Sequence, residues 1–124
     1  MLFSTSLKLE ANILQPTLLQ VYNDDLNFTT ESGVVQLDSA NQWYYLIIET
    51  SNAVPHPIHL HGHDMSILAQ GTGSYDSSDV TLDLTNPPRR DTAMLPASGY
   101  LVIAFETDNP GSWLCHCHVS TSQA

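Results

Sequence analysis

Hydrophobic residues in this chain occur in short runs rich in β-branched and aromatic side chains, which is the pattern of β-strands. No segment of ten or more residues shows the 3.6-residue periodicity of an amphipathic helix. Turn-forming residues separate the runs, for example at 71–73 and 109–111. The pattern therefore predicts strands over residues 17–22, 33–37, 42–49, 65–69, 91–95, 100–105 and 112–118.

Strands of this number and spacing predict an all-β sandwich or barrel. The 124 residues suffice for a single domain with one hydrophobic core. We place this domain at residues 17–118, after a weakly patterned N-terminal end, 1–16, and before a short tail, 119–124.

The charge balance excludes some partners. Thirteen acidic residues against three basic ones give a formal net charge of -10, which repels nucleic acid and anionic lipid. No apolar run approaches the roughly 18 residues of a membrane span. The first residues carry Lys8 and Glu10 where a secretory signal peptide would be apolar. Asn27 nevertheless begins an N-glycosylation sequon, which matters only in a secreted protein. We therefore expect a piece of a longer protein.

Residues that bind metals gather in two short clusters. The first holds His56, His59, His61 and His63, and the second covers residues 115–118, which read Cys-His-Cys-His. Imidazole and thiolate are ligands that suit copper and zinc. Two such clusters in one small acidic domain predict a metal-binding protein.

Alternation along a strand separates the ligands of the second cluster. Cys117 would face one side of the strand, whereas His116 and His118 would face the other. One metal centre cannot easily use all three side chains. Two centres on opposite sides of the strand could, and the backbone would then join them.

The first cluster fits the same plan. His59 and His61 share a strand face and can offer two imidazoles to one site. His56, followed by proline, points elsewhere and could join Cys117 in a copper site. Gly62 interrupts the strand, so we expect His63 to support a ligand or to lie at the surface.

Other metal sites fit less well. Structural zinc sites usually pair their ligands on turns, whereas these ligands lie on strands. A cupin-like barrel would need a carboxylate soon after His-x-His, where this chain has Met65 and Ser66. A disulfide between Cys115 and Cys117 would close a strained small ring.

Four segments carry a resemblance to a known family: 56–64 (HPIHLHGHD), 86–91 (NPPRRD), 95–105 (LPASGYLVIAF) and 108–118 (DNPGSWLCHCH). Over roughly residues 18–118, the chain resembles the C-terminal, third cupredoxin domain of a multicopper oxidase, most like an ascomycete fungal laccase. The resemblance implies a Greek-key β-sandwich or barrel of the cupredoxin, plastocyanin-like type.

The resemblance also implies a cofactor, copper, and an activity. In the family, phenolic-type substrates are oxidised and dioxygen undergoes four-electron reduction to water, in an extracellular protein. N-terminal cupredoxin domains would be further partners. Asp91 near Arg89 and Arg90 would form a structural ion pair. The implied copper ligands are His56 and Cys117 for type 1, His59 for type 2, and His61, His116 and His118 for type 3.

The chain departs from the family pattern at one ligand. Four residues after His118, where the family has the last type 1 histidine, stands Ser122. The axial type 1 ligand would fall beyond Ala124, and the trinuclear centre needs further histidines from N-terminal domains. We therefore expect an incomplete fragment that is inactive alone. The alternatives are a non-enzymatic copper-binding module and a zinc-stabilised sandwich.

Overall fold

The computed structural model describes residues 34–117. The chain divides into two units, 1–38 and 39–124, and every strand described below belongs to the second. Several predictions fall outside the described residues. They are the strand at 17–22, the sequon at Asn27, the ligand His118 and the substituted position Ser122.

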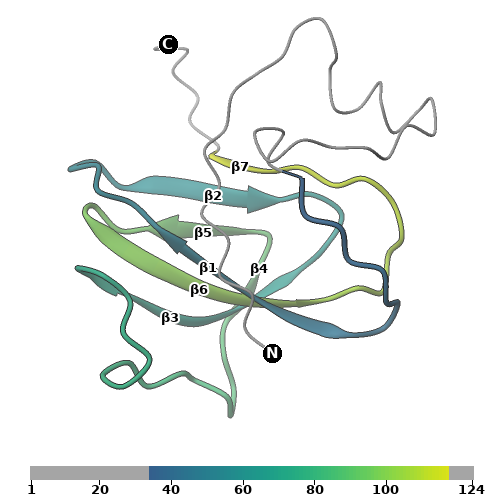
Figure 1. Cartoon of the computed structure of the whole chain (residues 1–124), viewed down its shortest axis with the longest axis horizontal. Helices are drawn as coiled ribbons and strands as arrows, with labels where there is room; N and C mark the ends of the chain where they lie inside the picture. The colour runs from purple at the N-terminus through teal and green to yellow at the C-terminus, as the bar shows by residue number, and fades with distance from the viewer. Residues whose placement is uncertain (1–33, 118–124) are drawn as a thin grey trace, which may run out of the picture. The chain divides into compact units, whose positions relative to one another are not determined.

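Within residues 34–117, seven strands form two antiparallel sheets, whose arrangement can be followed in Figure 1. One sheet has the order β1-β6-β3-β4 and the other the order β5-β2-β7. This two-sheet arrangement confirms the predicted all-β sandwich. The strands are β1 (Trp43–Glu49), β2 (His56–Leu60), β3 (Met65–Thr72), β4 (Arg89–Arg90), β5 (Thr92–Leu95), β6 (Gly99–Glu106) and β7 (Cys115–Cys117).

Two strand predictions and one turn prediction need correction. Residues 34–37 form no strand; Val35 and Leu37 are exposed, so this hydrophobic run creates no buried face. The predicted turn at 71–73 is wrong at its start, because Gly71 still pairs with Tyr100 in the ladder between β3 and β6. The last strand is shorter than predicted and spans only Cys115–Cys117. The pattern also missed β4, which has only two residues.

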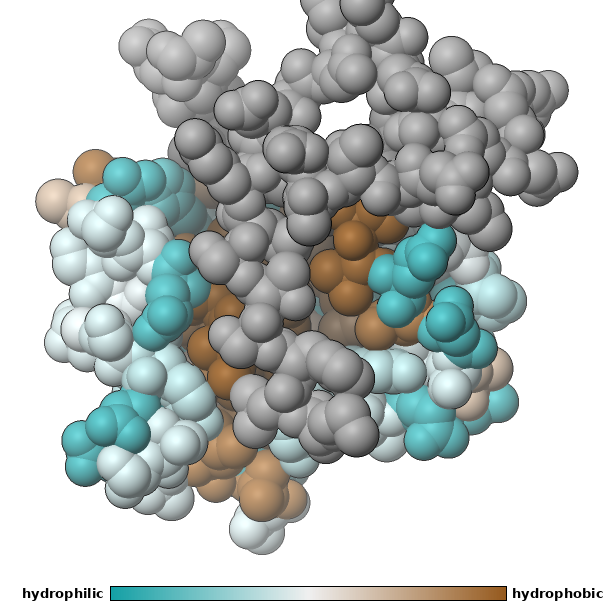
Figure 2. All heavy atoms as spheres, viewed as in Figure 1, coloured by the Kyte–Doolittle hydropathy of each residue, from teal (hydrophilic) through white to brown (hydrophobic). Residues whose placement is uncertain are grey.

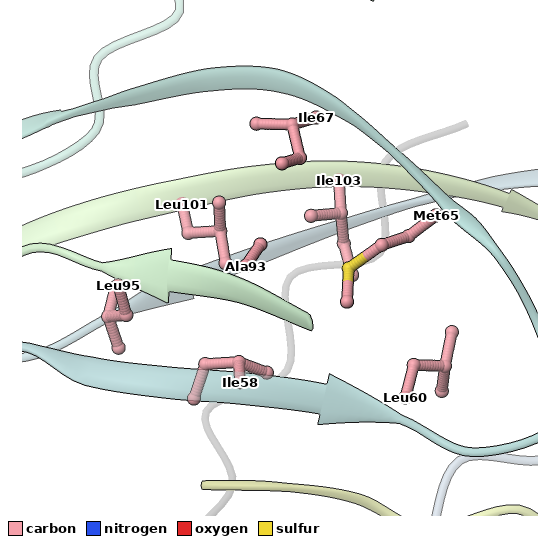
Figure 3. Close-up of a cluster of buried hydrophobic side chains, with 8 residues drawn as sticks. All are labelled: Ile58, Leu60, Met65, Ile67, Ala93, Leu95, Leu101 and Ile103. Atoms are coloured by element: carbon pink, nitrogen blue, oxygen red, sulfur yellow. The ribbon is translucent and has the colours of Figure 1, made fainter. Parts of the chain in front are cut away.

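The main core lies between the two sheets. Alternate side chains of the facing strands meet there, as the close-up in Figure 3 shows. Met65, Leu101 and Ile103 are fully buried. Burial of each such side chain contributes about 1.5–3 kcal/mol. The cluster consists of Ile58, Leu60, Met65, Ile67, Ala93, Leu95, Leu101 and Ile103.

A second cluster covers the other face of the four-stranded sheet. Leu68 of β3 joins Val102 and Ala104 of β6 there, and an irregularity in β3 between Ile67 and Ala69 puts Ala69 on the same face. Strand β6 is therefore buried on both faces. In the view of Figure 2, hydrophobic residues gather towards the middle of the molecule, and most hydrophilic ones lie nearer its sides.

Candidate metal centre

Strand β2 divides the first histidine cluster between two faces. Ile58 and Leu60 are buried in the main core, and His56 has the same strand parity as these two residues. His59 has the opposite parity and lies on the outer face of the β5-β2-β7 sheet. His61 follows the end of the strand.

Strand β7 brings the second cluster beside the first. The two strands are antiparallel, with Cys117 opposite Ile58 and His116 opposite His59. Cys117 packs against the main core, whereas His116 meets the outer histidines. The structure thus places neighbouring residues of one short strand in two different groups, which we call the inner pair (His56, Cys117) and the outer group (His59, His61, His116).

The inner pair is in direct contact. His56 Nδ1 lies 3.3 Å from Cys117 Sγ. The other ring nitrogen, His56 Nε2, is buried and has no hydrogen-bond partner among the described residues. A buried polar atom of this kind costs free energy, so a purely structural role explains this histidine poorly.

The outer group forms a compact set of three rings. The ring centroids of His59 and His61 are 4.7 Å apart, those of His61 and His116 4.9 Å, and those of His59 and His116 5.8 Å. His61 Nε2 and His116 Nε2 are 2.8 Å apart.

Backbone carbonyls fix the orientation of two outer rings. His59 Nδ1 donates to the Asp91 carbonyl at 2.8 Å and also lies 3.2 Å from Thr92 Oγ1. His116 Nδ1 donates to the Cys117 carbonyl at 3.1 Å. In the neutral rings the lone pair is therefore on Nε2, the arrangement in which metal-binding histidines are commonly held.

His63 belongs to neither set. Its Nδ1 donates to the His61 carbonyl at 3.1 Å, and its ring packs edge-on against Phe105 and Trp113. The sequence pattern predicts a supporting or surface role for this residue but gives no sign of these three contacts.

The predicted ion pair is wrong in its partner. Arg89 Nη2 pairs with Asp64 Oδ2 at 3.6 Å, and both side chains are largely exposed. Pairing of β3 with β4 sets Arg89 opposite Ser66, which brings it near Asp64. Asp91 instead contributes its main-chain carbonyl to His59.

Two further features surround the ligands. Both cysteines are free; Cys115 is exposed as a residue, yet partial desolvation raises the pKa of its thiol. A polar hollow of about 600 Å³ lies beside His59, and its lining includes Asp64, Asp91 and Glu106.

The donor set fits copper in pairs. Two donors bound to one ion at about 2.0–2.3 Å each lie roughly 2.8–3.8 Å apart for bond angles of about 90–110°. The Nδ1–Sγ distance of the inner pair falls within this range, and the Nε2–Nε2 distance of His61 and His116 lies at its lower end. Within residues 34–117, however, no group of three or more His, Cys, Asp or Glu side chains is arranged to hold an ion.

Comparisons with known proteins identify the family. Residues 4–123 match the family model described as multicopper oxidase. Laccase-1 of Botryotinia fuckeliana is 52% identical over 112 residues, which cover 88% of this chain and 20% of that protein. The laccase of Neurospora crassa is 45% identical over 121 residues, covering 86% of this chain and 20% of that protein.

A solved structure gives the same result. The crystal structure of the laccase from Botrytis aclada matches with 49% identity and a TM-score of 0.69, over 82% of this chain and 20% of that one. The chain therefore belongs to the multicopper oxidase family, which implies copper centres. It closely resembles the C-terminal domain of ascomycete fungal laccases, as predicted. It spans about a fifth of the length of these relatives.

The described residues contain no helix long and apolar enough to cross a membrane.

Proposed function

We propose that this chain is the copper-binding C-terminal part of a laccase-like oxidase. The longer protein would oxidise phenolic-type substrates and reduce dioxygen to water. One observation carries the proposal. Two adjacent residues of β7 contact different histidines of the first cluster: Cys117 lies against His56, and His116 lies against His61. The peptide unit between His116 and Cys117 would therefore connect the two copper centres covalently.

We assign the ligands as the family resemblance implies. His56 and Cys117 would bind type 1 copper, and His59 would bind type 2 copper. His61 and His116, together with His118 outside the described residues, would bind type 3 copper. Copper, when bound, supplies one-electron redox chemistry.

The protein residues prepare the site for this cofactor. The Asp91 carbonyl holds the proton of His59 on Nδ1, which places the lone pair of the neutral ring on Nε2. The His116 ring is held in the same way by the Cys117 carbonyl. The Cys117 side chain packs against the main core, which partly shields its sulfur from water.

Two parts of the proposed copper site are not supplied by the ligands named above. The remaining ligands of the trinuclear centre would come from N-terminal cupredoxin domains. Ser122 offers a hydroxyl where the family has an imidazole, and a hydroxyl is a poor ligand for this copper. The parent protein would be extracellular and could carry a glycan at Asn27.

The decisive experiment restores the missing imidazole. After Cu(II) addition, we expect no intense thiolate-to-copper absorption from the 124-residue chain and a clear band from the Ser122→His variant. In that background, Cys117→Ser should abolish the band, and the matched change Cys115→Ser should preserve it. A band that depends on Cys115 instead would refute the ligand assignment.

Oxygen uptake tests the claim of incompleteness. The isolated chain should consume no dioxygen with a phenolic substrate, because it holds only part of each centre. Measurable turnover would show that this view is wrong.

A non-enzymatic copper-binding module is the second candidate. The 3.3 Å contact of His56 and Cys117 favours it, because these two donors meet within this one domain. Copper binding that persists while no combination with N-terminal laccase domains restores oxygen uptake would support this alternative.

A further inference from the structure

The indole of Trp113 lies between two glycines from different segments. A Cβ built on Gly62 would lie 2.5 Å from Trp113 Cδ2, and one built on Gly111 would lie 3.1 Å from Trp113 Cζ2. Gly62 also has a φ of 70°, which disfavours any other residue. The turn after β2 and the segment before β7 are therefore shaped around this ring.

Hydrogen bonds fasten the same contact. Trp113 Nε1 donates to the Asn109 carbonyl at 2.8 Å, and Asn109 Nδ2 donates to the Gly62 carbonyl at 2.9 Å. The His61 amide donates to the Leu114 carbonyl at 2.9 Å. The four residues Gly62, His63, Asn109 and Trp113, which we call the brace, thus tie the two ligand-bearing segments together.

His63 connects the brace to a ligand. Its Nδ1 donates to the His61 carbonyl, and its ring packs edge-on against Trp113 with centroids 5.8 Å apart. A movement of Trp113 would therefore displace the backbone of His61 through two sets of contacts, those with the Gly62 turn and those with His63.

The core does not explain Trp113. Its side chain remains 42% exposed and belongs to neither core cluster. Its contacts are instead with residues beside the ligands: Gly62 and His63 directly follow His61, and Trp113 itself lies three residues before His116.

We propose that Trp113 is a positioning residue that sets the spacing between His61 Nε2 and His116 Nε2. The inference rests on the proposed copper function, since the spacing of the two rings matters only if they bind copper together. Outer residues that orient metal ligands typically change metal affinity about 10- to 100-fold when they are replaced.

The test compares the chain's two tryptophans. Trp113→Phe keeps an aromatic ring over Gly62 but removes the Nε1 donor to Asn109. Trp43→Phe is the matched control, because Trp43 is also exposed and lies in neither core cluster. Imidazole ¹⁵N NMR of the metal-free 124-residue chain should show an altered signature of the His61–His116 contact in Trp113→Phe but not in Trp43→Phe. Cu(II) affinity by calorimetry should fall about 10-fold in the same variant.

The outcomes separate the two proposals. An unchanged metal-free NMR signature in Trp113→Phe overturns the positioning role. If Trp113→Phe alters the NMR signature but the wild-type chain binds no Cu(II), the positioning role is supported and the copper function is refuted. Asn109→Ala, which removes the amide bond to Gly62, should act in the same direction. If both variants lose the sheet fold by circular dichroism, the brace serves folding instead, and the proposal is wrong.

Discussion

The two sides of strand β2 hold histidines in opposite ways. On the inner side, His56 touches Cys117 beside the core, and its Nε2 has no partner among the described residues. On the outer side, His59 donates to a carbonyl and lies among other rings. Packing therefore defines the inner pair, whereas hydrogen bonds define the outer group. Mutations should affect the two sides by different mechanisms.

The largest effect should come from the core beneath the inner pair. Ile58→Ala removes a buried side chain opposite Cys117 and should lower the free energy of unfolding by about 2–5 kcal/mol. Met94→Ala, on the exposed side of β5, should stay within about 0.5 kcal/mol. Urea unfolding of the two variants measures this difference, and equal losses would contradict the division into an inner and an outer side.

A smaller effect of opposite sign should separate the two histidines. In metal-free protein, His56→Leu removes a buried unpartnered nitrogen and should raise the free energy of unfolding by about 1 kcal/mol. His59→Leu removes hydrogen bonds and should lower it by about 1 kcal/mol. Thermal melts in the presence of a chelator measure both.

The opposite signs are the informative result. Destabilisation by His56→Leu would mean that the contact with Cys117 outweighs the unsatisfied nitrogen. Binding of Cu(II) should fall in both variants, whatever the sign of the stability change.

The smallest effect should come from Asp76, which belongs to neither face of β2 and therefore provides a baseline. Hydrogen bonds from the Ser78 hydroxyl and amide lower the pKa of Asp76 below its ordinary value. The stabilisation is present above the unfolded-state pKa and is lost as the pH falls through the folded-state pKa. Asp76→Asn should thus differ slightly from wild type in urea unfolding at neutral pH, and the difference should vanish in acid. A difference that grows in acid would reverse this assignment.

Much of the sandwich follows from local pattern. The hydrophobic runs at 43–48 and 100–105 made the strands β1 and β6 predictable, although only β6 is largely buried and β1 stays half-buried or exposed. The run at 34–37 was misleading, because a hydrophobic pattern cannot show whether a partner strand will cover it. The two-residue β4 is too short for any periodicity to appear.

The grouping of the candidate residues could be predicted from the sequence, but the contacts that hold them could not. Strand parity alone is enough to separate Cys117 from His116. The Asp91 carbonyl at His59, by contrast, is a main-chain group, which side-chain identity does not reveal. The indole between Gly62 and Gly111 depends on how two loops meet, and no spacing rule describes that.

The adjacency of Cys117 and His116 has a consequence for how such a domain can evolve. Consecutive Cα atoms are held about 3.8 Å apart by covalent geometry, so no rearrangement of loops can change the separation of these two positions. Selection can alter the surroundings of each face almost independently, because different side chains form them. Evolution therefore keeps the separation of these two backbone positions constant, whereas it can change the chemistry on each face.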